Sequence, residues 1–162
     1  MSKEHQAYVI TGAGSYLGKA FAEYLSANKN NKIFLTSRRK EDDFLERLRN
    51  NNIMYLPDID LTKKEKLDEL HEQITNFIPK KFHVINCVGC FPGYKIIGDM
   101  DYAEIAQVYN SNLLSLTYVA HRLVPLMCKR GGGHFIGFSM HTAYQHYPKM
   151  VAFTAAKIAV ER

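Results

Sequence analysis

Several features that would indicate a membrane, secreted or repetitive protein are missing from this sequence of 162 residues. Its apolar runs are far shorter than the roughly 20 residues that a membrane-spanning helix needs. The N-terminal residues are polar and no apolar signal-peptide core follows them. No internal repeat or low-complexity linker divides the chain. These absences predict a single domain over residues 1–162, in the cytoplasm and away from membranes.

Cysteine is scarce, with only Cys87, Cys90 and Cys128 in the chain. An odd and small number of cysteines is typical of proteins from a reducing compartment. Cys87 and Cys90 have the spacing of a redox pair or of half a zinc site, and His141 and His146 have a plausible ligand spacing. Because these histidines lie far along the chain from the cysteines, we expect neither a metal site nor a disulfide.

Acidic residues are fewer than basic ones, so the formal net charge is +5. A basic protein invites comparison with nucleic-acid-binding proteins. Here, however, the lysines and arginines are scattered, and most stand beside carboxylates or glycines. We therefore expect a solvated basic surface and no nucleic-acid partner.

The most informative stretch lies near the N-terminus, where a β-branched run ends in a glycine-rich turn. Val9, Ile10 and Thr11 are followed by three glycines within seven residues, and an apolar-periodic segment begins at Leu17. A strand, a tight turn and a helix in this order bring unpaired backbone N–H groups and the helix dipole to a phosphate. Glycine spacing alone is a weak signal, so the rest of the chain has to support it.

Strands and helices alternate along the whole sequence. The expected strands are residues 7–11, 32–36, 53–56, 82–86 and 134–138. The expected helices are residues 17–28, 41–49, 62–77 with Thr62 as N-cap, 102–129 with a joint near 110–112, and 151–162. This alternation predicts an α/β fold, a doubly wound parallel sheet of the Rossmann type. Ligands bind such sheets beyond the carboxyl ends of the strands.

Five segments at or beside these strand ends carry a resemblance to a known family. They are Thr11-Gly12 with Gly18, Asp60-Leu61, Ile85-Asn86-Cys87-Val88-Gly89, Asn110-Ser111-Asn112-Leu113 and Ala155-Ala156-Lys157. In this order the chain resembles the short-chain dehydrogenase/reductase family over essentially its whole length. The resemblance implies an NAD(P)-binding Rossmann fold and hydride transfer between nicotinamide and a small carbonyl or alcohol substrate.

The same resemblance implies a set of cofactor-binding residues. They are Gly12, Gly14, Ser15, Tyr16, Leu17, Gly18, Ser37, Arg38, Asp60, Leu61, Asn86, Val88, Gly89 and Lys157. Tyr16 stands where the family usually has glycine, so its bulky side chain must point away from the pyrophosphate.

The end of the second strand indicates which cofactor is bound. A carboxylate there would accept hydrogen bonds from the adenosine ribose and repel a 2′-phosphate. This chain instead has Ser37 and Arg38, with no carboxylate before Glu41. A guanidinium suits phosphate, and Ser37 can add a hydroxyl. We therefore predict NADP(H) over NAD(H), the alternative being that the arginines merely cover a helix start.

The catalytic residues implied by the resemblance are only partly present. Asn112 and Lys157 match, but Phe153 stands at the position of the tyrosine that delivers the proton. The serine that orients the substrate carbonyl falls by spacing on Met140, with Ser139 adjacent to it. Our candidate catalytic set is therefore Asn112, Ser139, Phe153 and Lys157. Loss of a general acid typically costs roughly 10²–10⁴-fold in rate.

Three explanations for Phe153 remain open. In the first, the phenylalanine is an engineered replacement of tyrosine. In the second, it is natural, and Tyr144, Tyr147, His141 or His146 supplies the proton. In the third, the protein binds NADP(H) without turning it over. The two functional hypotheses are thus an NADP(H)-dependent oxidoreductase and a catalytically impaired or non-catalytic NADP(H)-binding or regulatory protein.

The C-terminal end of the sequence interrupts a helical pattern. The helix that carries Lys157 continues to Arg162 without a cap, glycine or proline stop. We expect a fragment that lacks the C-terminal strands and the substrate-binding segment of the family pattern. The resemblance also implies a homo-oligomer formed through the long helix before Gly131 and the Lys157 helix, whose Ala155, Ala156 and Ala159 would permit close packing.

Overall fold

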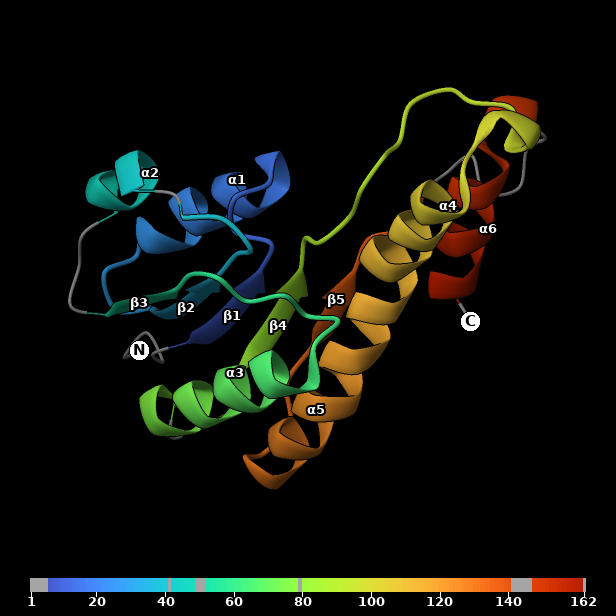
Figure 1. Ribbon diagram of the computed structural model, residues 1–162. Coiled ribbons are helices and arrows are strands. Elements are labelled where there is room, and N and C mark those ends of the chain that lie inside the picture. The colour runs from blue at the N-terminus through green and yellow to red at the C-terminus, as the bar shows by residue number, and fades with distance from the viewer. Residues whose placement is uncertain (1–5, 41, 49–51, 79, 141–146, 162) are drawn as a thin grey trace.

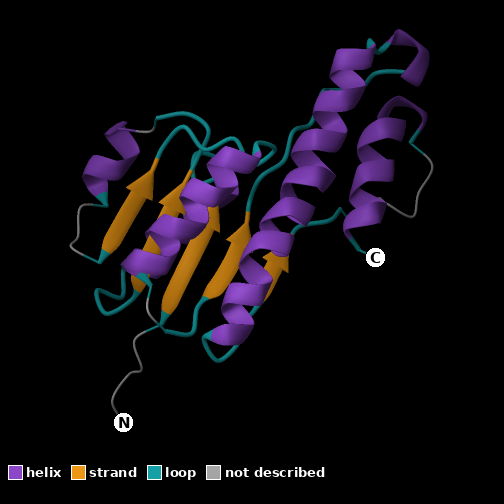
Figure 2. Cartoon of the chain, turned by 60° about the horizontal axis from the view of Figure 1, so that its bottom comes forward, coloured by secondary structure: helices purple, strands orange, loops and turns teal. Residues whose placement is uncertain are grey.

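Five parallel strands form one sheet in the order β3-β2-β1-β4-β5 (Figure 2). The computed structural model describes residues 6–40, 42–48, 52–78, 80–140 and 147–161. The strands are β1 (Ala7–Thr11), β2 (Lys32–Thr36), β3 (Ile53–Leu56), β4 (His83–Asn86) and β5 (Phe135–Gly137). The chain reverses its direction of travel across the sheet between β3 and β4, so the doubly wound Rossmann-type prediction is confirmed.

Helices cover both faces of the sheet (Figure 1). They are α1 (Tyr16–Ser26), α2 (Asp42–Arg47), α3 (Lys64–Phe77), α4 (Tyr102–Tyr109), α5 (Ser115–Lys129) and α6 (Val151–Val160). Helices α1 and α2 lie on one face, and α3 and α5 lie on the other. In the part of the chain that the structure describes, no helix is both long and apolar enough to cross a membrane.

Alternate side chains along the central strands pack into two separate hydrophobic cores, one on each face of the sheet. Val9 packs with Leu70 of α3 and Leu123 of α5 on one face. Its neighbour Ile10 faces the other way and packs with Phe44 of α2. Because successive side chains of a strand point to opposite faces, burial of both faces requires the continuous apolar strands seen in the sequence.

The long helical region after β4 divides where the sequence predicts a joint. A π-helical turn over Asn110–Leu114 separates α4 from α5. Asp101 begins α4 with a capping box that it forms with Glu104. Helices α4 and α6 pack together beyond the sheet, at the upper right of Figure 1, around Val108 and Ala156.

The start of α3 differs from the prediction. Thr62 was expected as the N-cap, but the cap residue is Lys63, which makes no capping bond with its side chain. Thr62 is held by Asp60 instead, because its amide and its hydroxyl both donate to Asp60 Oδ1, at 3.0 and 2.7 Å. The threonine therefore shapes the strand end before the helix, not the helix itself.

Candidate functional site

The first turn of the chain packs tightly against the segment that follows β4. Gly12 has a φ of 70°, and a Cβ added there would lie 2.8 Å from the backbone carbon of Cys87. A Cβ on Gly18 would lie 2.3 Å from the Gly12 carbonyl oxygen. Both glycines are therefore required by close backbone approach, which is what a turn around a phosphate needs.

The N-terminus of α1 suits an anion. Ser15 caps the helix, and its hydroxyl accepts the Gly18 amide at 3.0 Å. No acidic residue stands in the first turn. Tyr16 is 90% exposed and Leu17 is 43% exposed, so neither side chain covers the helix end. The backbone amides and the positive end of the helix dipole are left to bind a pyrophosphate.

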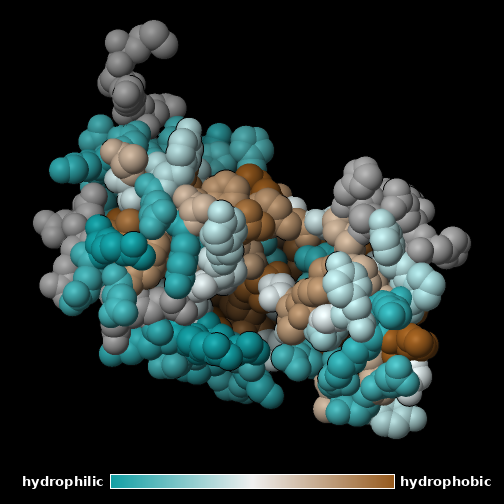
Figure 3. All heavy atoms as spheres, turned by 90° about the horizontal axis from the view of Figure 1, so that it is seen from above, coloured by the Kyte–Doolittle hydropathy of each residue, from teal (hydrophilic) through white to brown (hydrophobic). Residues whose placement is uncertain are grey.

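A cleft of about 510 Å³ runs along the carboxyl ends of the strands. Many of the predicted cofactor residues line it: Gly12, Gly14, Ser15, Ser37, Arg38, Asp60, Leu61, Val88 and Gly89. Seen from above in Figure 3, the surface is hollowed between the sheet, with α1 and α2, and the lobe formed by α4 and α6. Ala106 and Gln107 of α4 form part of the wall.

Gly18 and Asn86 lie beneath this surface and not on it. Gly18 is buried behind the turn. Asn86 is buried at the end of β4, where its side-chain oxygen accepts the Thr11 hydroxyl at 2.6 Å. This bond joins the ends of the two central strands. The hydroxyl of Thr36, which lines the cleft, is buried without a partner among the described residues and is an available donor there.

The predicted adenosine end of the cleft combines two arginines, Arg38 and Arg39, with one carboxylate. Arg38 is exposed at the end of β2. Partial burial opposes ionisation of Asp60, but the Thr62 hydrogen bonds and the charges of Lys63 and Arg38 outweigh it and lower the pKa of the carboxyl. Asp60 is thus an anion at neutral pH, and among the described residues lining the cleft it is the one carboxylate.

The Ser37 hydroxyl makes different hydrogen bonds from those predicted. Its hydroxyl was expected to add a hydrogen bond to a 2′-phosphate, but Ser37 is buried and the hydroxyl is engaged inside the protein. It lies 2.6 Å from the Tyr55 hydroxyl and also bonds to the Arg39 carbonyl oxygen. The orientation follows from Tyr55 on the neighbouring strand, which local sequence does not reveal.

The predicted nicotinamide end brings Lys157, Asn112 and Gly89 together. A Cβ on Gly89 would lie 3.1 Å from Asn112 Oδ1 and 3.7 Å from Lys157 Nζ. The Lys157 ammonium is buried and donates to the Phe138 carbonyl at 2.8 Å. Burial lowers its pKa from the ordinary lysine value. Gly89 lines the cleft, whereas Lys157 and Asn112 lie buried behind it and are not among the lining residues.

Asn112 holds the chain that forms this end of the site. Its amide nitrogen donates to the carbonyls of Cys90 and Val108, at 2.7 and 2.9 Å. Its side-chain oxygen accepts the Cys90 amide at 3.3 Å. The residue lies in the π-helical turn, so the irregular turn places this amide against the segment after β4.

Phe153 occupies the place where the family pattern has its acid. Its ring packs edge-on against Phe91, with centroids 5.2 Å apart. The Lys157 ammonium lies 5.8 Å from the centre of the Phe153 ring. The ammonium therefore lies over the Phe153 ring, at the position where the family pattern has a tyrosine. A phenyl ring has no hydroxyl proton to donate.

Ser139 faces away from this cluster. Its hydroxyl bonds to the Lys157 carbonyl at 2.9 Å and to Glu161 Oε1 at 2.5 Å. Both partners belong to α6 or its end, so the serine ties the chain after β5 to this helix. Met140, at the spacing expected for the carbonyl-orienting serine, has no hydroxyl to offer.

The cysteines are unpaired by disulfides and belong to no metal-binding cluster in the described part of the chain. Cys87, Cys90 and Cys128 are free thiols, and burial raises the pKa of Cys87 to about 12. The described residues contain no group of three or more side chains able to hold a metal ion. His141, Tyr144 and His146, which were considered as ligands or proton donors, lie outside the described residues.

Several residues of the site were not predicted, among them Ala106 and Gln107 of the cleft wall and the three that follow. Tyr55 supports the Arg38 segment, Phe91 packs on Phe153, and Thr36 lines the cleft. For Thr36 the signal was available, since it ends a strand at the ligand-binding edge. The contacts of Tyr55 and Phe91 depend on strand order and on the course of a long loop.

Known proteins resemble this chain over most of its length. Residues 6–162 match a family model described as short chain dehydrogenase. An uncharacterized oxidoreductase of Staphylococcus aureus (strain MRSA252) is 29% identical over 154 residues, which are 94% of this chain and 65% of that protein. An NAD-dependent glycerol dehydrogenase of Listeria innocua is 26% identical over 152 residues, 94% of this chain and 59% of that protein.

A solved structure of ElxO with NADP bound has the same fold. Its TM-score is 0.85 at 21% identity, with 96% of this chain and 64% of that chain covered. This chain thus spans 65% or less of the length of these two curated relatives. The matched model extends over nearly all of the sequence, and the chain belongs to the short chain dehydrogenase family.

Proposed function

We propose that this chain binds NADP(H) in the cleft, with the adenosine end at Arg38. The observation that carries the proposal is an exposed guanidinium at the end of β2, where a carboxylate would select NAD(H). A planar, permanently charged donor is well suited to a 2′-phosphate. ElxO with NADP bound supports the choice, whereas the Listeria relative is NAD-dependent, so cofactor preference is the point to test.

Equilibrium titration with NADPH and NADH, followed by nicotinamide fluorescence, tests the proposal. We expect NADPH to bind at least about tenfold more tightly, which corresponds to about 1.4 kcal/mol. Equal affinities, or tighter binding of NADH, would contradict it.

For the reaction, two functions compete. In the first, the chain is an NADP(H)-dependent oxidoreductase acting on a small carbonyl or alcohol, and the bound nicotinamide supplies or accepts a hydride. Lys157 would bind the cofactor ribose, and Asn112 would hold the surrounding chain. In the second, the chain is catalytically impaired or non-catalytic and acts by binding NADP(H).

The geometry favours the second function for the chain as it stands. Phe153 has no proton to give and Ser139 is engaged with α6. Phe153 therefore cannot supply the acid, and Ser139 is not free to orient a carbonyl beside Lys157. Absence of the acid alone is expected to lower the rate by roughly 10²–10⁴-fold.

Oxidation of NADPH in the presence of a panel of ketones and aldehydes separates the two functions. We expect no turnover by the chain as it is, and turnover after Phe153→Tyr combined with Met140→Ser. The same double variant carrying Lys157→Met is the control and should be inactive. Clear turnover by the unaltered chain would refute the non-catalytic function.

A further inference from the structure

We propose that Tyr55 is a positioning residue for cofactor preference, because its hydroxyl contacts the Arg39 backbone and the Ser37 side chain on either side of Arg38. The proposal rests on the function proposed above and assigns a new residue to it. Tyr55 lies in β3 and does not belong to the five segments that carry the resemblance to the family.

Two described contacts of the Tyr55 hydroxyl lie on one short segment. Its hydroxyl donates to the Arg39 carbonyl at 2.7 Å and lies 2.6 Å from the Ser37 hydroxyl. The Ser37 hydroxyl bonds to the same Arg39 carbonyl. The two hydroxyl protons are shared among these three oxygens, and the phenol contacts the residue on each side of Arg38.

The sheet in turn fixes the position of Tyr55. In the parallel register of β2 and β3, Tyr55 is paired with Leu35, two residues before Ser37. Its ring packs against the buried cluster that includes Leu35 and Phe44. The Ile59 amide donates to the Ser37 carbonyl at 3.1 Å and adds a second tie from the chain after β3.

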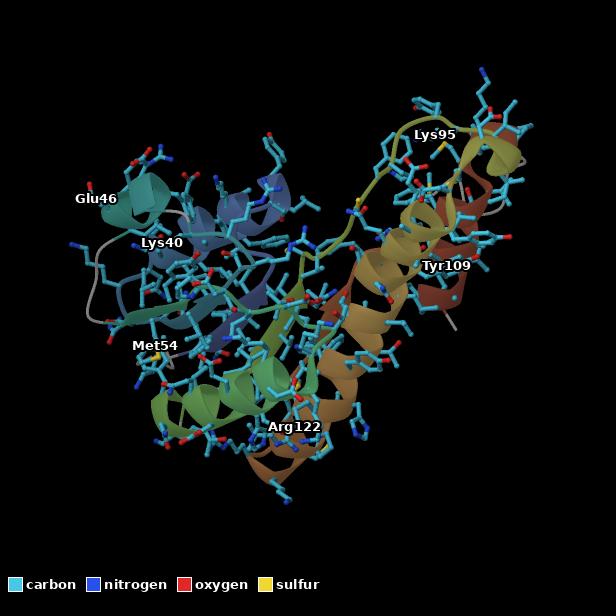
Figure 4. All side chains as sticks on the ribbon, viewed as in Figure 1. Lys40, Glu46, Met54, Lys95, Tyr109 and Arg122 are labelled. Atoms are coloured by element: carbon cyan, nitrogen blue, oxygen red, sulfur yellow. The ribbon has the colours of Figure 1, made fainter. Side chains whose placement is uncertain are left out.

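This arrangement leaves Arg38 exposed on a restrained backbone segment, with Arg39 exposed beside it in the lining of the cleft. The positive charge of Arg38 contributes to lowering the pKa of Asp60, which lines the same cleft. Lys40, labelled in Figure 4, continues the segment above β2 and β3, beside α2. An exposed arginine loses rotamer freedom when it binds phosphate, and a fixed backbone reduces the freedom that remains to be lost. Tyr55 therefore acts on the 2′-phosphate through Arg38.

Two nucleotide fragments measure this effect directly. Adenosine 2′,5′-bisphosphate carries the 2′-phosphate, and 5′-AMP lacks it. For Tyr55→Phe we expect the Kd of the bisphosphate to rise about five- to tenfold, the size of one lost hydrogen bond. The Kd of 5′-AMP should change less than about twofold. Tyr24→Phe, in an exposed tyrosine of α1, is the matched control and should change neither value.

The outcomes separate this proposal from the one on which it rests. If the unaltered chain binds the bisphosphate no better than 5′-AMP, the NADP(H) proposal fails, and this inference fails with it. If Arg38→Ala weakens the bisphosphate while Tyr55→Phe does not, only the role of Tyr55 is refuted. If Tyr55→Phe weakens both nucleotides equally, the tyrosine supports the fold in general, which also refutes the proposal.

Discussion

Lys157 carries a charge in a place that disfavours it. The side chain is buried, its hydrogen-bond partner is the Phe138 carbonyl, and burial lowers its pKa below the ordinary value of 10.5. The folded chain therefore releases this proton at a lower pH than the unfolded chain. Below the folded pKa the full cost of the buried charge is present, and the cost disappears as the pH rises through 10.5.

Lys157→Met should therefore raise the stability of the chain at neutral pH. We expect a Tm increase of a few degrees at pH 7 that shrinks as the pH approaches the ordinary lysine pKa. Thermal unfolding of both proteins at several pH values checks this. Lys149→Met, at an exposed lysine, is the control and should show no such trend. A gain that is independent of pH would show that the lost charge is not its cause.

The sequence was enough to predict which residues gather at the strand ends, but it did not predict the directions of their side chains. Gly12, Gly89, Asn112 and Lys157 follow from motif position and strand order. The hydroxyl of Ser139 is directed by partners on α6, a helix that begins more than ten residues later. A sequence pattern places a serine beside the site, while only the packed helix shows that it faces away.

At the scale of elements, the strand–turn–helix at the N-terminus depends on backbone approaches that exclude any side chain. The hydrophobic pattern located β1 and α1 correctly, since both are amphipathic or apolar over several residues. The start of α3 was misplaced because Asp60 and Thr62 form a local hydrogen-bonded turn before the helix. Caps of this kind compete with one another, and tertiary packing decides between them.

Gly18→Ala tests the turn. The added Cβ would lie 2.3 Å from the Gly12 oxygen, so the turn must shift. We expect a loss of roughly 1–3 kcal/mol in the free energy of unfolding, as in other overpacked sites, together with weaker NADPH binding. Gly98→Ala is the matched control, since nothing lies within 4 Å of its added Cβ, and it should stay within about 0.5 kcal/mol. Urea unfolding measures both, and equal effects would refute the argument from close approach.

At the scale of the whole molecule, strand order concentrates the site at one edge of the sheet. Alternation of strands and helices was enough to predict this edge, because parallel strands joined by crossovers place their carboxyl ends together. The expected homo-oligomer stays a prediction. Val124 of α5 and Ile158 of α6 are exposed, as a subunit interface on these helices would require.

Our central proposal is that the cleft selects NADP(H) by its 2′-phosphate, through the positive charge of Arg38 at the end of β2. The most direct measurement is the ratio of the NADH Kd to the NADPH Kd, for the unaltered chain and for Arg38→Asp. We predict a ratio of about ten or more for the chain, and a ratio of one or below for the variant, because a carboxylate there repels the phosphate. A chain that binds NADH more tightly, with a ratio that Arg38→Asp leaves unchanged, would contradict the account.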